Sequence, residues 1–212
     1  MSESTSFSPP LYHLVLDDVF WAYYEHTLEQ IGDRRLYVTY CDGCIEIMSP
    51  VPEHEQPKRV IGRLIEALTL EAGIPMRAFG STTFRREDRR GGLEPDECYY
   101  ITNEQKSRGM KRFDPLRYPA PDLAVEIDVF SRSIAREPIY ARLGVPELWR
   151  YSGLRVVVRL LQEDGLYVDS PTSALFPWLP MVELDRYVDR MLEEEQNSVV
   201  LDFGKWIRGL PR

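Results

Sequence analysis

The 212-residue sequence is poor in cysteine and has no long apolar run. Three cysteines are too few for a framework of disulfide bonds. No stretch approaches the roughly 18 consecutive apolar residues that a membrane-spanning helix needs, and the first ten residues lack the pattern of a secretory signal. We therefore expect a cytoplasmic protein without a membrane partner, with a flexible tail over residues 1–12 and a single domain over residues 13–212.

Basic residues are outnumbered, with 26 Lys and Arg against 34 Asp and Glu, and the formal net charge is −8. This balance argues against a protein that coats nucleic acid indiscriminately, because such proteins rely on a large excess of positive charge. It is compatible with an enzyme that has an acidic metal site and a local basic surface.

The spacing Cys41-Asp42-Gly43-Cys44 matches half of a zinc site or a redox pair. However, Asp-Gly is a typical hairpin-turn dipeptide, and strand-like runs flank it on both sides. Zinc needs four ligands, and the one remaining cysteine lies far along the chain. The pattern favours a hairpin turn over a metal centre.

Helical and strand-like patterns alternate along the chain without an internal repeat or a linker. Helices are expected over residues 16–30, with Asp17 or Asp18 as the cap, and over 54–72, 134–143, 184–195 and 201–207. A hairpin is expected over residues 35–48, an extended segment over 74–84, and strands over 94–101, 123–130, 147–151, 155–161 and 165–168. This alternation predicts an α/β fold with one mixed central β-sheet flanked by helices.

Two carboxylates stand out because they lie in or beside apolar strands. Glu126 interrupts the run from Leu123 to Phe130, and Asp96 begins another strand directly after Pro95. If these strands are neighbours, the two side chains converge at one edge of the sheet, and carboxylate oxygens suit Mg²⁺. Acids near strand ends also cap helices or pair with arginine, so the residues alone leave both interpretations open.

Several short motifs occur in a defined order along the chain. Glu94-Pro95-Asp96, the run 121–126 and the run 139–149 follow the segment 45–50 and the pair His54-Glu55. This order resembles the Uma-two-type restriction endonuclease family, once catalogued as a domain of unknown function, within the PD-(D/E)XK nuclease superfamily. The resemblance extends from about Leu16 to Trp206 and implies a restriction-endonuclease-like fold that hydrolyses DNA with Mg²⁺, or alternatively with Mn²⁺.

The resemblance also implies roles for individual residues. Asp96 and Glu126 match the metal-binding acids of the superfamily, and Glu55 matches the acid on its first core helix. His54 stands beside Glu55 and is a further candidate ligand or base, or simply a residue packed at the start of the helix.

One position departs from the superfamily pattern. The lysine expected two residues after Glu126 is Asp128, and Arg136 from the following helix takes the basic position. Arginine can hold phosphate oxygens, but it stays protonated and is a poor general base. The alternative is therefore a weakly active or inactive protein on the same fold, which binds nucleic acid or protein.

Two further acids share a strand face with Glu126. Asp122 and Asp128 lie four residues before it and two residues after it, so we expect both beside the metal site. Because Asp122 follows a proline at a strand start, it is also suited to capping a turn through backbone hydrogen bonds.

Two basic segments flank the predicted site in sequence and are candidates for contacting the DNA backbone. The alternative is that both are solvated loops. A homodimer is a further expectation, because cutting both strands requires two sites. The basic residues are Arg85, Arg86, Lys106, Arg108, Lys111 and Arg112.

Overall fold

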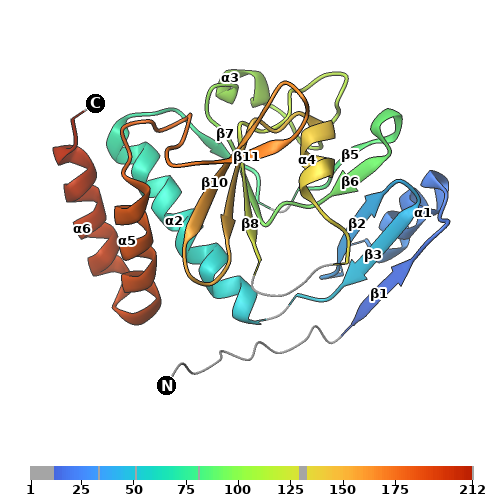
Figure 1. Ribbon diagram of the computed structural model, residues 1–212, viewed down its shortest axis with the longest axis horizontal. Helices are drawn as coiled ribbons and strands as arrows, with labels where there is room; N and C mark the ends of the chain where they lie inside the picture. Colours follow the sequence, from blue (N-terminus) through green and yellow to red (C-terminus); the bar gives the residue numbers. More distant parts are fainter. Residues whose placement is uncertain (1–11, 33, 51, 81, 129–132, 212) are drawn as a thin grey trace.

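The computed structural model describes residues 12–32, 34–50, 52–80, 82–128 and 133–211, and these form two β-sheets with helices around them (Figure 1). The larger sheet has six strands in the order β11-β10-β9-β8-β7-β4. Its strands are β4 (Arg77–Ala78), β7 (Glu97–Tyr100), β8 (Leu123–Ile127), β9 (Glu147–Tyr151), β10 (Val156–Leu161) and β11 (Tyr167–Ser170).

The pair β8 and β9 is parallel, whereas the other neighbouring strands of the large sheet are antiparallel. A parallel pair needs a crossover connection, and helix α4 (Glu137–Leu143) lies in it. All five residues of β8 are buried because helices cover both of its faces. The sheet is therefore mixed, as the sequence pattern predicted.

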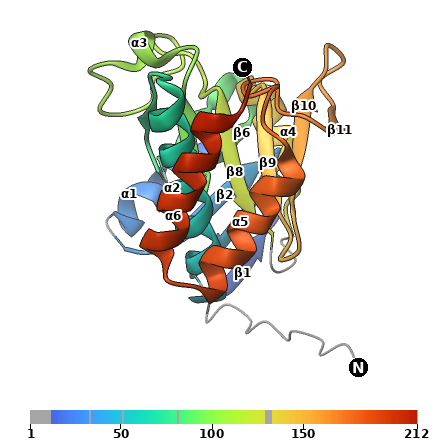
Figure 2. The same cartoon turned by 90° about the vertical axis from the view of Figure 1, so that its left-hand side faces the viewer.

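The two faces of β8 contact different helices. Leu123, Val125 and Ile127 pack with α2 (Pro52–Ala72), α5 (Met181–Glu193) and α6 (Gln196–Gly209), which lie together over one face (Figure 2). Ala124 packs on the opposite side against α4. Because side chains alternate along a strand, Glu126 shares the α4 side with Ala124.

The smaller sheet has five strands in the order β1-β3-β2-β6-β5. Helix α1 (Trp21–Ile31) packs on it through Tyr24, which stacks on Tyr40 with ring centroids 5.1 Å apart. Its strands are β1 (His13–Leu16), β2 (Tyr37–Cys41), β3 (Cys44–Met48), β5 (Phe84–Arg86) and β6 (Gly91–Leu93). A short 3-10 turn, Glu87–Arg89, joins β5 to β6, and α3 (Glu104–Ser107) interrupts the loop before β8.

This second sheet corrects the expectation of a single central one. Residues 13–16 form a strand because they pair with β3, with Leu16 opposite Ile45, so the first helix begins only at Trp21. Phe20 occupies the N-cap position expected for Asp17 or Asp18. The hairpin turn is confirmed, because Asp42 and Gly43 have φ angles of 48° and 94° between β2 and β3.

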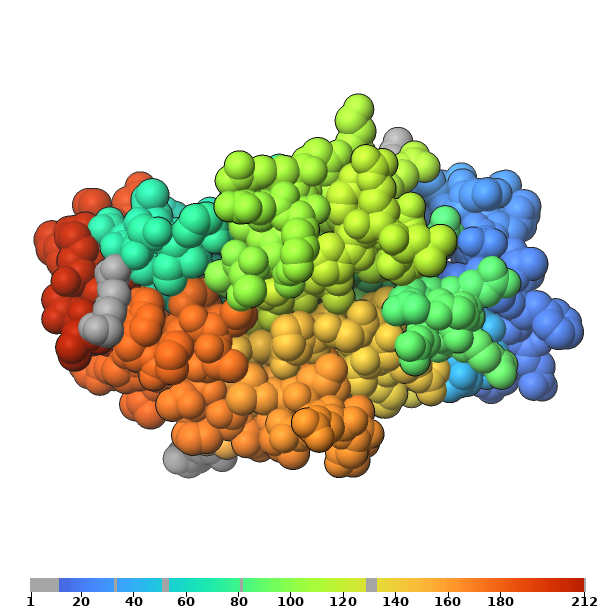
Figure 3. All heavy atoms as spheres, turned by 90° about the horizontal axis from the view of Figure 1, so that it is seen from above, coloured from blue at the N-terminus to red at the C-terminus, as the bar shows by residue number. Residues whose placement is uncertain are grey.

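The chain runs across the molecule from the small sheet to the C-terminal helices. Seen from above, α1 and the blue N-terminal strands lie at one end and the red helices α5 and α6 at the other (Figure 3). The middle of the chain lies between them. No described helix is both long and apolar enough to cross a membrane.

Candidate active site

Asp96 and Glu126 meet at the end of the large sheet that lies towards the small one. Glu97 pairs with Val125 in the antiparallel register of β7 and β8, which places Asp96 opposite Glu126 at the next position. Asp96 is fully buried, and the exposed fraction of Glu126 is 3%. Two carboxylates at such depth need cationic or hydrogen-bonding neighbours, since burial disfavours an isolated charge.

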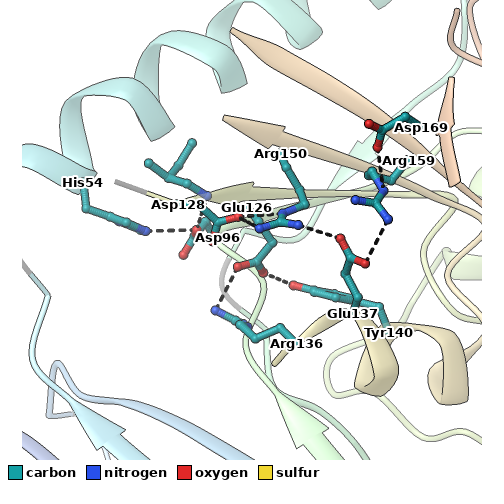
Figure 4. Close-up of polar contacts among 11 residues, drawn as sticks. His54, Asp96, Glu126, Asp128, Arg136, Glu137, Tyr140, Arg150, Arg159 and Asp169 are labelled. Carbon is teal, nitrogen blue, oxygen red and sulfur yellow. Dashed lines mark hydrogen bonds and ion pairs between the residues drawn. The ribbon is translucent and has the colours of Figure 1, made fainter. Parts of the chain in front are cut away.

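The surroundings of Asp96 come from a helix and from the neighbouring strand. Nε2 of His54, near the start of α2, lies 2.9 Å from Oδ2 of Asp96 (Figure 4). The backbone N–H of Ile127 donates to the same oxygen at 2.7 Å. His54 is itself buried, so it is a fixed contact of the site, which the sequence had offered only as one alternative.

Glu126 is held by two residues from the segment that starts α4. Nη1 of Arg136 lies 3.0 Å from its Oε2, and the hydroxyl of Tyr140 donates to its Oε1 (Figure 4). Arg136 also donates to the backbone carbonyl of Glu94. The structure thus brings Arg136, the residue at the basic position of the family resemblance, into contact with Glu126.

Burial and neighbouring charges determine the protonation states of Arg136 and Tyr140. Burial lowers the pKa of Arg136, but the charges around it, of which Glu126 contributes most, together outweigh burial and raise that pKa above its ordinary value. Burial raises the pKa of Tyr140 well above its ordinary value, and the charge of Glu126 raises it further. Arg136 is therefore a permanent cation and Tyr140 a neutral hydrogen-bond donor.

Sequence reasoning gave no role to Tyr140, although it lies in the motif run 139–149. Its spacing of four residues from Arg136 places both side chains on one side of the chain at the start of α4. The four-residue spacing from Arg136 is therefore the feature of the sequence that could have identified Tyr140 as a residue of the site.

Asp128 contacts an arginine close to the carboxylate pair. Its Oδ2 accepts from Nε of Arg150 at 2.6 Å, and Nη1 of Arg150 lies 2.7 Å from Glu137. Glu137 continues the chain of ion pairs to Arg159 at 3.3 Å, and Arg159 pairs with Asp169 at 3.0 Å (Figure 4). Asp128 thus links β8 to β9 and, through Glu137, to α4.

Asp122 and Glu55, two other acids that were predicted at the site, contact residues other than Asp96 and Glu126 in the described structure. Asp122 accepts hydrogen bonds from the backbone N–H groups of Ile101 and Asn103 at 2.7 and 2.9 Å, which makes it the cap of a turn. Glu55 accepts from the hydroxyl of Tyr37 at 3.2 Å and lies 3.7 Å from Nδ1 of His54. Glu55 is therefore adjacent to His54 rather than to Asp96.

Several of the predicted DNA-contacting residues have local partners. Arg85 pairs with Glu25 at 3.5 Å, Arg86 with Asp88 at 2.7 Å, and Arg108 with Glu104 at 2.8 Å. Lys106 donates to Asn103 at 2.9 Å, whereas Lys111 and Arg112 are exposed. The three arginines are each paired with a carboxylate, and an arginine paired in this way binds a phosphate group less strongly than an unpaired one does.

The side chains that could serve as metal ligands can be compared with the ligands that Mg²⁺ requires. Within the described residues, no group of three or more His, Cys, Asp or Glu side chains could by itself hold a metal ion. Mg²⁺, however, is commonly bound through one or two carboxylates and completes its shell with water and substrate oxygens. The facing carboxylates of Asp96 and Glu126 fit that requirement.

Comparisons with known proteins place the chain in a family. A search of curated proteins gave no significant match. A crystal structure of "a putative nuclease belonging to DUF820" from Anabaena variabilis ATCC 29413 is similar at 16% sequence identity and a TM-score of 0.45, covering 80% of this chain and 90% of that chain. Residues 21–185 match the family described as "Uma2: Putative restriction endonuclease". Because this match covers most of the sequence, the chain belongs to that restriction endonuclease family.

Proposed function

We propose that this protein is a Mg²⁺-dependent endonuclease that hydrolyses phosphodiester bonds of DNA, with Mn²⁺ as an alternative ion. The observation that carries the proposal is the buried pair Asp96 and Glu126, opposite one another on adjacent strands, with the Arg136 guanidinium 3.0 Å from Glu126. Membership of a restriction endonuclease family supports the same chemistry.

Asp96 and Glu126 would hold the ion. When bound, Mg²⁺ supplies an activated water and neutralises negative charge on the phosphate and the leaving oxygen. His54 and the Ile127 N–H fix the orientation of Asp96, while Tyr140 fixes that of Glu126.

Arg136 provides a cation beside the phosphate that is being cleaved. Hydrolysis transfers the phosphorus from the leaving oxygen to a water oxygen, and negative charge develops on the oxygens around it. A guanidinium stabilises such charge through hydrogen bonds. Its raised pKa keeps it protonated, so Arg136 does not act as the base.

The test is nicking of supercoiled plasmid DNA with Mg²⁺, with Mn²⁺ and with neither ion. Asp96→Asn and Glu126→Gln remove one negative charge each while keeping side-chain size, and we expect each to lower the nicking rate by about 100-fold or more. The matched control is Asp164→Asn, which removes a charge from an exposed turn. Equal nicking by the wild type and both site variants would refute the proposal.

A second candidate function is binding without cleavage on the same fold. The observation that favours it is Asp128, which stands where the superfamily has lysine and binds Arg150. Titration calorimetry separates the two candidates. Binding of DNA or a protein partner without uptake of Mg²⁺ or Mn²⁺ supports the binding module, whereas metal uptake that Asp96→Asn abolishes supports the enzyme.

A homodimer belongs to the same proposal, because two cuts in a duplex require two sites. Sedimentation of the protein with and without DNA measures its mass directly. A monomer under both conditions would restrict the activity to nicking.

A further inference from the structure

A cavity of about 640 Å³ lies between the small sheet with α1 and the first turns of α2. Its size falls within the range of natural ligand sites, roughly 300–1,000 Å³. Three basic residues contribute to its lining: Arg34 and Arg35 from the connection before β2, and Lys58 from α2. The cavity is therefore bordered by cations from two separate elements.

These three cations are available to an outside ligand. Arg34 and Arg35 are exposed and Lys58 is half-buried, and none forms an ion pair with a carboxylate of the described residues, although the charge of Lys58 lowers the pKa of the Glu94 carboxyl in the same lining. Arg85, Arg86 and Arg108 differ in this respect, since a carboxylate lies within 3.5 Å of each. Unpaired guanidinium and ammonium groups at a cavity are suited to phosphate oxygens.

Two walls of the cavity lead to the carboxylate pair. On one wall, Tyr37 donates to Glu55, and the rings of Tyr37 and His54 lie 6.0 Å apart, with His54 in turn contacting Asp96. On the other wall, the backbone carbonyl of Glu94 accepts from Arg136. A ligand in the cavity is thus next to residues that touch the site.

The acids of the lining have partners of their own. The hydroxyl of Thr83 donates to Glu94 at 2.8 Å, and Glu55 accepts from Tyr37. With three basic and two acidic side chains, the lining keeps an excess of positive charge in a protein whose net charge is −8. Such a local excess attracts an anionic chain that the rest of the surface repels.

We propose that this cavity holds the sugar–phosphate backbone of the DNA strand beside the scissile phosphate, with Arg34, Arg35 and Lys58 contacting its phosphates. This inference rests on the proposed function for its substrate, DNA. It assigns strand binding to the cavity between α1 and α2 rather than to the basic segments around residues 85 and 108.

The test measures binding without cleavage, by fluorescence anisotropy of a labelled DNA duplex and its single strand in EDTA. We expect Arg34→Ala/Arg35→Ala to weaken binding about tenfold for each side chain lost. The slope of log affinity against log salt should fall by about two, since two phosphate contacts are removed. Lys58→Ala should weaken binding about tenfold and lower the slope by about one.

The matched control is Arg186→Ala/Lys205→Ala, which removes two cations that are 70% and 69% exposed on α5 and α6. It changes the net charge from −8 to −10, as the first double variant does. Equal loss of affinity in the two double variants would show a general charge effect and overturn the inference. Wild-type affinity in the Arg34 and Arg35 variant, or no DNA binding by the wild type, would also overturn it.

Parallel nicking assays separate this inference from the proposed function. If the wild type binds DNA, the cavity variants weaken binding and no plasmid is nicked, the inference holds and the nuclease proposal fails. If the wild type nicks DNA and the cavity variants bind it normally, the nuclease proposal holds and the inference fails.

Discussion

Glu94 is the residue that belongs both to the cavity and to the surroundings of the site. Burial raises the pKa of its carboxyl above 4.5, although the Thr83 hydroxyl, Arg136 and Lys58 act in the opposite direction. An acid with a raised folded-state pKa binds its proton more tightly in the native than in the unfolded state. Its ionisation therefore opposes folding.

This shift predicts how stability depends on pH. Below the unfolded pKa of about 4.5 both states are protonated, and Glu94 contributes nothing. As the pH rises through the raised folded pKa, the native state loses stability, and above it the loss is complete. Glu94→Gln should therefore be more stable than the wild type near neutrality, with an advantage that disappears as the pH falls towards 4.5.

Urea unfolding of both proteins across this pH range measures the difference directly. Glu104→Gln is the control of opposite sign, because Arg108 lowers the pKa of Glu104 by hydrogen bonding. A Glu94→Gln advantage that is the same at every pH would contradict the assignment.

At the residue scale, the sequence named the central acids and, through the family resemblance, Arg136 and His54, but it did not identify Tyr140 or the ion pairs around the site. Asp96 and Glu126 were recognisable because charged residues interrupt or border apolar strands, and a family motif surrounds them. The contacts of Arg150 with Asp128 and of Glu94 with Arg136 join residues 22 and 42 positions apart, which no local spacing reveals. Glu55 was expected at the pair, yet the helix geometry turns the neighbouring His54 towards Asp96 instead.

At the element scale, Arg150 ties the start of α4 to the sheet. The helix has only seven residues and no side-chain hydrogen bond at its N-cap, Arg136. Glu137, the next residue, is bound by Arg150 from β9, and Arg150 also binds Asp128 at the end of β8. These ion pairs hold Arg136 and Tyr140 where they meet Glu126.

Arg150→Met should therefore misplace these partners without removing them. We expect the maximal nicking rate to fall about tenfold while the DNA concentration for half-maximal rate stays unchanged. The loss of stability should stay near 1 kcal/mol, because Arg150 is 39% exposed and solvent weakens its ion pairs.

Asp169→Asn is the control for this prediction, since it breaks the 70%-exposed far end of the same chain of ion pairs. Its nicking rate and stability should match those of the wild type. A wild-type rate in Arg150→Met would show that α4 is positioned by its buried apolar residues alone.

Gly92 sets how closely α1 approaches the small sheet. A Cβ atom at this position of β6 would lie 2.3 Å from the hydroxyl oxygen of Tyr24 and 2.8 Å from the adjoining ring carbon, and Tyr24 is fully buried. Gly92→Ala should cost about 1–3 kcal/mol of unfolding free energy, because the close-packed helix must shift.

The matched control is Gly209→Ala at the end of α6, where an added Cβ meets nothing within 4 Å. Alanine favours the helix there, so a gain of up to about 1 kcal/mol is expected. Urea unfolding measures both variants, and a Gly92→Ala variant as stable as the wild type would contradict this packing.

The elements themselves were predictable to different degrees. The hairpin of β2 and β3 followed from the Asp42-Gly43 turn, and strand β9 coincides with its predicted range, 147–151. Strand β1 was not predicted, and its last residue, Leu16, was placed in the first helix, because its pairing partner, β3, lies about 30 residues further along. The split into two sheets likewise depends on long-range pairing, such as that of Tyr40 with Gly92.

At the scale of the whole molecule, the core extends beyond the part that matches the family. That match ends at residue 185, yet Val199, Phe203 and Ile207 of α6 are fully buried in the cluster that also contains Val125 of β8. Helix α6 packs mainly against α2, the helix whose first turn carries His54. The last helix therefore supports the element that positions one contact of Asp96.

Phe203→Ala tests this dependence. Phe203 is 0% exposed and packs against Tyr187 and Trp206 with ring centroids 4.9 and 5.7 Å apart. Its truncation should lower the unfolding free energy by about 3–5 kcal/mol through lost burial and a cavity. Leu201→Ala, 65% exposed on the same helix, should change it by less than about 0.5 kcal/mol. Equal urea midpoints for the two variants would mean that α6 is an appendage rather than part of the core. A selective loss in Phe203→Ala would show that α6 contributes to the core that anchors α2.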